Sequence, residues 1–275
     1  MVVVTRVIKR RRGRSQPWLM EGEDQEFYVV KAANNPQGRR TLVNDWIGSK
    51  LLRLLGVNAA DCKTIRIPEI LIETNDLYLQ FGSKQVPVDS GPHFGSVCPV
   101  NPERASIYDY LPSSLLSQVT NIDDFYSTFV FDRWTANADS RQAVFYRPGR
   151  CRKLHALMID QGSTFQGVLW EFADLRRPRD FYEEAYKLTA SYEHLERIME
   201  RLSAISEQTL GDIVREIPTE WLEGDDQAAL TRLLKQLIRR QAHVLELVDR
   251  ATSTCTRAGD PDRSASGAIR WSRGV

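Results

Sequence analysis

The stretch LHALMIDQG, residues 154–162, ends an apolar run in an acid, Asp160, with a glycine two positions later. Apolar letters before the acid are typical of a buried strand, and Gln161–Gly162 predicts a flexible turn after it. Such an acid offers the hard oxygen ligand that Mg²⁺ prefers, and the ion completes its shell with phosphate and water. An ordinary strand-ending Asp in a turn is the alternative interpretation.

A second informative stretch, TANADSRQAVFYR, lies just before it at residues 135–147. The preceding residues predict a helix with Asn121 as its cap, and AVFYR predicts a strand. Asp139 therefore lies on a loop between the two, where a carboxylate can orient a substrate hydroxyl or accept its proton. Asn137 is either a turn former or an oxygen ligand. Arg141 can steady the charge of a transferred phosphate, although a surface salt bridge explains it equally.

Towards the N-terminus, WLM and EFYVVKA predict a hairpin of two strands, and NDWIGSKLLRLLG, residues 44–56, predicts a helix capped by Asn44. Lys31 ends the second strand and can place a cation beside phosphates. A strand-end lysine reaching towards water is the alternative. Asp45, expected in the first helical turn, can either pair with Lys31 or compensate the helix dipole.

The remaining segments suggest the organisation of the chain. Residues 64–72, TIRIPEILI, read as strand-like alternation interrupted by a proline. Residues 82–103 are rich in Gly, Pro and Ser and predict a long loop or a partly ordered insertion. SIYDYLP, residues 106–112, predicts a short strand and a connector. Residues 181–250 predict helices broken near Pro218, and the residues after Arg250 predict a disordered tail.

Composition narrows the class of protein. The 275 residues include 37 Lys and Arg against 36 Asp and Glu, which argues against wholesale attraction to nucleic acid. No apolar run approaches the roughly 20 residues that span a bilayer, and the N-terminal stretch does not resemble a secretory signal, so we expect a cytoplasmic protein without a membrane partner. The four cysteines lie too far apart in the sequence for a zinc ribbon.

The order of these parts is that of a kinase-like, two-lobed α+β fold. It predicts a small β-rich N-lobe over residues 1–107, a larger helical C-lobe over 108–250, and a tail over 251–275. A nucleoside triphosphate needs a cation beside its phosphates, a turn that covers them and carboxylates that hold Mg²⁺. Each part has a candidate in this chain.

On these residues the chain resembles the HipA-like kinases, specifically the short HipA-related members. The five blocks that carry the resemblance occur in the family's order: GRSQP (13–17), YVVK (28–31), ND (44–45), NADSRQAVF (137–145) and IDQG (159–162). Together they span roughly residues 6 to 200. The resemblance implies a protein-kinase-like fold that binds ATP with Mg²⁺.

The resemblance also implies roles for individual residues. Lys31 would bind the ATP phosphates, Asp139 would be the catalytic acid and Asp160 the metal ligand. The turn with Ser15 and Gln16 would cover the phosphates through backbone N–H groups. The connector around Tyr108 to Tyr110 would contact adenine.

Two departures from the family pattern affect the chemistry. Val144 stands where kinases usually have a metal-binding Asn, and Gln142 or Asn137 are the amides that could substitute for it. The helix acid is Asp45 rather than the longer Glu.

The leading hypothesis is an ATP-dependent phosphotransferase whose acceptor is a hydroxyl of a protein Ser or Thr, of the chain itself or of a small molecule or lipid. The alternatives are a nucleotide-binding pseudokinase or interaction module, motivated by Val144, and a toxin–antitoxin or nucleic-acid interaction protein that uses the basic residues 6–14. No aromatic stacking platform accompanies those basic residues, which argues against the last reading. The length also suggests that the chain lacks the DNA-contacting apparatus of longer HipA toxins.

Overall fold

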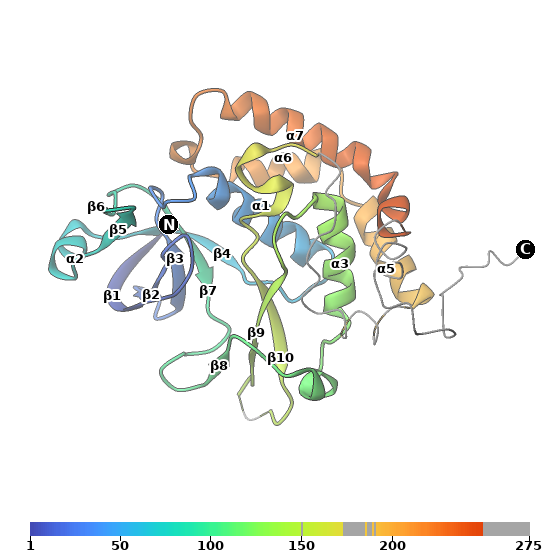
Figure 1. The fold of residues 1–275 in the computed structure, drawn as a ribbon, viewed down its shortest axis with the longest axis horizontal. Helices are drawn as coiled ribbons and strands as arrows, with labels where there is room; N and C mark the ends of the chain where they lie inside the picture. The colour runs from blue at the N-terminus through green and yellow to red at the C-terminus, as the bar shows by residue number, and fades with distance from the viewer. Residues whose placement is uncertain (150, 173–184, 186–188, 190, 250–275) are drawn as a thin grey trace, which may run out of the picture.

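The computed structural model describes residues 1–149, 151–172, 185, 189 and 191–249 (Figure 1). The first part of the chain contains β1 (Val2–Arg10), β2 (Trp18–Gly22), β3 (Phe27–Lys31), α1 (Arg40–Leu54), β4 (Cys62–Arg66), α2 (Glu69–Thr74), β5 (Tyr78–Phe81), β6 (Lys84–Pro87) and β7 (His93–Val97). The second contains β8 (Ile107–Tyr108), η1 (Ser113–Gln118), α3 (Asp124–Thr135), β9 (Gln142–Tyr146), β10 (His155–Ile159), η2 (Thr164–Leu169), α5 (Tyr192–Ser203), α6 (Glu207–Arg215), η3 (Thr219–Trp221) and α7 (Asp226–Gln241).

Five strands close into a barrel in the order β1-β2-β3-β7-β4, with β1 parallel to β4 and the other pairs antiparallel. The predicted hairpin is therefore present as β2 and β3. The prediction of a loop over residues 82–103 is wrong, because β6 and the barrel strand β7 lie within it. A Cβ on Gly95 of β7 would lie 2.3 Å from Ile65 Cγ1, so glycine there permits a close approach of β7 to β4. Pairing with two distant strands, rather than local alternation, makes this segment a strand.

Helix α1 begins five residues earlier than the sequence indicates, because its N-cap is Arg39. The turn before it contains Gly38 at φ +87°, and the Thr41 hydroxyl donates to the Gly38 carbonyl at 2.7 Å. The prediction of Asn44 as the N-cap is wrong, and Asp45 does not lie in the first turn. Asn44 and Asp45 both lie away from the ends of the helix, and their side chains are buried. The helix packs against β4 and β7 and also against α6 and η2. The helix does end as expected, at Gly56 with φ +79°.

Two further expectations need correction. The strand-like reading of residues 64–72 holds only for β4, because Pro68 stands immediately before helix α2. Proline lacks a backbone N–H and its φ suits a helix start, so it ends one element and begins another. The N-cap of α3 is Asp123 rather than Asn121, whose side chain instead bridges Asp124 and the backbone of β10 at Ala156.

The second part of the chain combines a three-stranded sheet, β10-β9-β8, with helices α3, α5, α6 and α7 (Figure 1). The fold is thus α+β, with a β-rich N-terminal part and a mainly helical C-terminal part. Trp134 of α3 lies in the main hydrophobic core and its indole N–H donates to the Leu237 carbonyl of α7 at 2.9 Å. In the described residues, no helix is both long and apolar enough to cross a membrane. The predicted tail and most of residues 181–190 lie outside the described residues.

Candidate functional site

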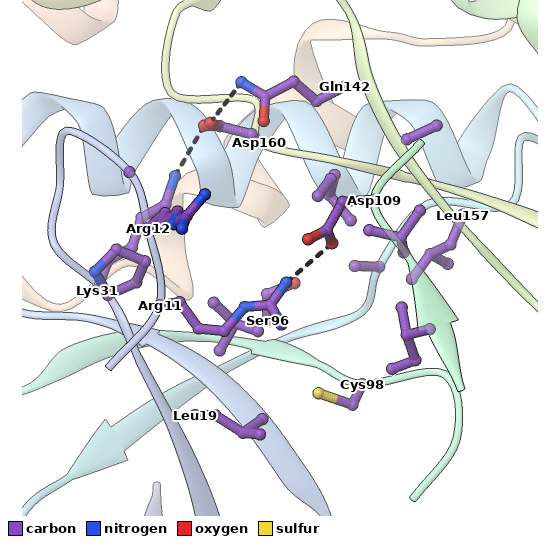
Figure 2. A pocket seen from close by; sticks show the side chains of 18 of the residues that line it. Arg11, Arg12, Leu19, Lys31, Ser96, Cys98, Asp109, Gln142, Leu157 and Asp160 are labelled. Carbon is purple, nitrogen blue, oxygen red and sulfur yellow. Dashed lines mark hydrogen bonds and ion pairs between the residues drawn. The ribbon is translucent and has the colours of Figure 1, made fainter. Parts of the chain in front are cut away.

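A buried lysine joins the barrel to the rest of the chain. Lys31 Nζ, at the end of β3, donates to Asp45 Oδ2 of α1 at 2.7 Å and to Asp160 Oδ1 after β10 at 2.8 Å. Figure 2 shows the contact with Asp160 at the edge of a pocket. Lys31 and Asp45 are 8% and 1% exposed, whereas 39% of the Asp160 side chain is accessible. Strand β3, helix α1 and the turn after β10 therefore meet at this one ammonium group.

The charges of this group depend on one another. Burial by itself lowers the pKa of Lys31, but attraction to Asp45 and Asp160 outweighs it, and the pKa lies above its ordinary value. Burial raises the pKa of Asp45 to about 6, although Lys31 acts in the opposite direction. Attraction to Lys31 is the main cause that lowers the pKa of Asp160. At neutral pH the lysine is charged between two carboxylates, and Asp45 is the first of the two to be protonated as the pH falls.

Asp160 owes its orientation to the turn that follows β10. The residue has φ +57°, a left-handed conformation that Asp tolerates better than most residues. The next backbone N–H, that of Gln161, donates to Asp45 Oδ1 at 2.7 Å. A Cβ on Gly162 would lie 3.3 Å from Asp45 Oδ2 and 3.5 Å from Asp160 Oδ1, a tight fit that glycine relieves. The IDQG stretch therefore presents its carboxylate beside Lys31.

Arg141 is buried beside the site and bonds to residues on both sides of it rather than lying free in solution. Arg141 is 3% exposed and its guanidinium forms an ion pair with Asp132 of α3, with Arg141 Nε 3.2 Å from Asp132 Oδ2. The same guanidinium donates to Gln161 Oε1. Asn137 is also buried here and donates to Asp132 Oδ1 at 3.1 Å. Arg141 lines the cleft, but its contacts connect α3 to the turn that carries Asp160.

The other two predicted residues of this region face the cleft. Asp139 is exposed, lines the cleft and accepts the backbone N–H of Ser140 at 2.8 Å. Gln142, at the start of β9, donates through Nε2 to Asp160 Oδ2 at 3.1 Å (Figure 2). Of the two amides that could substitute for the missing Asn, Gln142 lies beside Asp160, whereas Asn137 is held against Asp132.

The cleft has a volume of about 1070 Å³ and lies between the barrel and the sheet β8-β9-β10. Its walls include basic residues of the turn after β1, apolar residues of β2, β3, β9 and β10, and the segment that leads into β8. Residues that line the cleft include Arg11, Ser15, Leu19, Val29, Lys31, Tyr108, Asp109, Asp139, Val144, Leu157 and Asp160.

The residues of the predicted turn GRSQP face in different directions. Ser15 is 4% exposed and lines the cleft, and Gly13 adopts φ +145°. Gln16 does not point into the cleft. Its side chain donates to the Gln80 carbonyl at 2.7 Å and accepts the Gln80 N–H at 2.8 Å, which attaches the turn to β5.

The two tyrosines of the connector, residues 106–112, also face in different directions. Tyr108 lines the cleft, but Tyr110 is 61% exposed and is not among the residues that line it. Between them, Asp109 accepts Arg11 Nη2 at 2.9 Å, so a basic residue of the barrel reaches across the cleft to the connector (Figure 2). Sequence reasoning placed Arg11 in the basic stretch and Asp109 in the connector but missed their ion pair, because each is an ordinary charged residue until the two segments meet.

The residues present fit a divalent cation that takes most of its ligands from a bound molecule and water. Within the described part of the chain, no group of three or more His, Cys, Asp or Glu gathers into a metal cage. Asp160 contributes one accessible carboxylate, and Gln142 contributes an amide beside it. Mg²⁺ characteristically binds through one or two carboxylates and takes its other ligands from phosphates and water, so this donor set suits it.

Residues 3–249 match a family model described as HipA-like kinase. A search of curated proteins found no matching relative.

Solved structures with similar folds share low sequence identity with this chain. The proinflammatory kinase CtkA of Helicobacter pylori matches at a TM-score of 0.55 and 13% identity, covering 91% of this chain and 98% of that one. Fam20 of hydra, solved with sugar, matches at 0.51 and 13% identity, covering 92% and 87%. The Golgi casein kinase matches at 0.52 and 10% identity, covering 92% and 75%. At these identities the similarity establishes the fold, which is protein-kinase-like.

Proposed function

The chain belongs to the HipA-like kinase family, and on that premise we propose that it transfers the γ-phosphate of ATP to a hydroxyl group. The observation that carries the proposal is the contact of Lys31 Nζ with Asp45 and Asp160 at the edge of a cleft large enough for a nucleotide. The lysine binds phosphate oxygens, and Asp45 holds it in place from within α1.

The apolar end of the cleft suits adenine. Leu19 and Val29 of the barrel and Val144 and Leu157 of the sheet line it. An adenine ring between these walls loses apolar contact with water, and backbone groups beside Tyr108 offer hydrogen bonds at its edge. Val144, the residue that departs from the family pattern, then contacts the base rather than a metal ion.

The polar end suits the phosphates. Mg²⁺ bound with ATP would be held by Asp160 and Gln142 and would neutralise phosphate charge. Backbone N–H groups around Ser15 cover the phosphates from the barrel side. Arg141 acts through Gln161, whose backbone is fixed to Asp45, and so positions Asp160.

In the transfer step the acceptor oxygen forms a bond to the γ-phosphorus while the bond from that phosphorus to the bridging oxygen of ADP breaks. Asp139, accessible in the cleft, orients the acceptor hydroxyl and accepts its proton. The acceptor we propose is a protein Ser or Thr, in another protein or in this chain, with a small-molecule or lipid hydroxyl as the alternative.

A second function, nucleotide binding without transfer, is favoured by one observation. Val144 is 7% exposed and packs in an apolar cluster, so it offers no ligand to a second metal ion. The two functions differ in one measurable property, which is the release of ADP from ATP in the presence of an acceptor.

The test compares ATP turnover with Mg²⁺, using a generic protein acceptor, in wild type, Asp160→Asn and Asp139→Asn. We expect each substitution to lower kcat/KM at least 100-fold, and Asp139→Asn to retain the wild-type Kd for ADP. Asp212→Asn, in an exposed ion pair of α6, is the matched control and keeps wild-type turnover. Equal turnover in wild type and Asp160→Asn would overturn the assignment. Tight ADP binding without labelled product in wild type would support the second function instead.

A further inference from the structure

Asn44 makes an unusual set of contacts for a residue inside a helix. Its side chain is fully buried, and the two hydrogens of Nδ2 are shared among the carbonyl oxygens of Gly162 at 2.9 Å, Thr164 at 3.1 Å and Gly167 at 2.9 Å. Its Oδ1 accepts the indole N–H of Trp170 at 2.7 Å. One amide therefore joins α1 to four points of the segment that follows Asp160.

The segment 160–170 contains strained backbone as well as local hydrogen bonds, such as that from the Thr164 N–H to the Gln161 carbonyl at 3.0 Å. Asp160, Phe165, Gln166 and Trp170 all have positive φ, between 53° and 58°. Each such residue costs on the order of 1 kcal/mol relative to a right-handed conformation, and such strain persists only where surrounding contacts impose it. The segment packs against α1 as the turn η2, where its carbonyls need donors from other elements.

The residue next to Asn44 serves the same segment and the nucleotide lysine together. Asp45 accepts the Gln161 N–H through Oδ1 and the Lys31 ammonium through Oδ2, both at 2.7 Å. One turn of α1 thus fixes the lysine, the start of the segment at Asp160 and the carbonyls beyond it. A shift of α1 would move all of them.

We infer that Asn44 is a positioning residue that holds the segment 160–170 in the conformation in which Asp160 faces the cleft. This inference deepens the proposed function and rests on it for its catalytic consequence. Loss of the amide leaves three carbonyls and one indole N–H without their partner, and the strained residues relax. Asp160 then samples conformations that point away from the phosphates, which affects turnover more than nucleotide affinity.

Hydrogen exchange of the whole chain tests the inference without relying on activity. We expect amides of the segment 160–170 to exchange at least 10-fold faster in Asn44→Ala than in wild type. Asn35→Ala is the matched control, because Asn35 is buried as well, at 3% exposed, and within the described residues its side chain bonds to its own turn, at the Ala32 carbonyl and the Gln37 N–H. It should leave that segment unchanged. Equal exchange of the segment in the two variants would overturn the inference.

A second variant covers the case in which Asn44→Ala does not fold. Trp170→Phe keeps an aromatic ring and removes the N–H that Asn44 accepts, together with the second ring of the indole. We expect faster exchange in the same segment, by a smaller factor, with the rest of the protein unchanged. Wild-type exchange of the segment in Trp170→Phe, combined with unfolding of Asn44→Ala, would assign Asn44 to general stability and reject the inference.

Kinetics then distinguish positioning from a purely structural role. Residues that orient a metal ligand typically affect activity 10- to 100-fold, so we expect kcat of Asn44→Ala to fall by about that factor. KM for ATP should change less than about 3-fold, and Asn35→Ala should change neither. Equal changes in kcat and in the folded fraction would reject positioning. Absence of transfer by wild type would refute the proposed function, while the exchange comparison would still decide the role of Asn44.

Discussion

His93 offers a test of how the barrel supports the strand that carries Lys31. The ring is fully buried in β7, and its Nδ1 accepts the backbone N–H of Ala33, two residues after Lys31, at 3.0 Å. An acceptor nitrogen carries no proton, so the histidine in the folded protein is neutral. Burial lowers the pKa of His93 to about 4, although the backbone of Asp89 acts in the opposite direction.

The pH dependence follows from the difference between folded and unfolded states. In the unfolded chain a histidine has a pKa of about 6.5, so between pH 6.5 and 4 the unfolded state binds more protons than the folded state. The contribution of His93 to the free energy of unfolding is complete above pH 6.5 and falls as the pH decreases through this window. With the folded pKa at about 4, the loss between pH 8 and pH 5 amounts to about 2 kcal/mol.

The measurement is the free energy of unfolding in urea at pH 8 and pH 5 for wild type and His93→Asn. The amide oxygen of the variant can still accept the Ala33 N–H, but it does not titrate. The variant should therefore lack about 2 kcal/mol of the decrease that wild type shows. Asp45 titrates in the same window with the opposite sign, because its pKa is raised to about 6, and the comparison cancels it. An identical decrease in both proteins would refute the reasoning.

Three other predictions concern the barrel and the cleft. Gly95→Ala places a Cβ 2.3 Å from Ile65 Cγ1 and should destabilise the protein by about 1–3 kcal/mol in urea unfolding. Gly211→Ala is the control, because a Cβ there has nothing within 4 Å, and it should be neutral or stabilising. Equal effects of the two substitutions would contradict the close approach of β7 to β4. Gln142→Ala should raise the Mg²⁺ concentration for half-maximal ADP binding about 10-fold, and an unchanged titration would remove it from the metal site. Val144→Asn should destabilise by about 1–3 kcal/mol, because it buries an amide among apolar side chains, and wild-type stability would show that a partner exists there.

Several elements were predictable because their determinants are local. The hairpin β2–β3, the strands β9 and β10 and the stop of α1 at Gly56 follow from alternation and from turn residues. The candidates Lys31, Asp139 and Asp160 were recognisable because strand ends and short loops present polar side chains in a characteristic order. The resemblance to HipA-like kinases rests on that order as well, and the family match agrees with it.

Other features follow from contacts between distant segments. Residues 93–97 form a barrel strand only because β3 and β4 lie on either side of them, so their own composition indicates a loop. Asn is a residue type that often caps helices, but the turn at Gly38 lets the helix begin before Asn44. The Asn44 side chain is therefore buried, and its amide bonds to the segment after Asp160. Gln16 likewise bonds to β5 instead of facing the cleft.

The sequence by itself determined the types of chemical group in this protein and their order along the chain, because each short motif indicates the local backbone conformation of its own residues. Only the tertiary structure decided which groups meet: that Asp45 and Asp160 share Lys31, that Gln142 rather than Asn137 adjoins Asp160, and that Arg11 reaches the connector. Side-chain hydrogen bonds form within about 3 Å, and the relative placement of separate elements to that precision depends on the packing of the whole core.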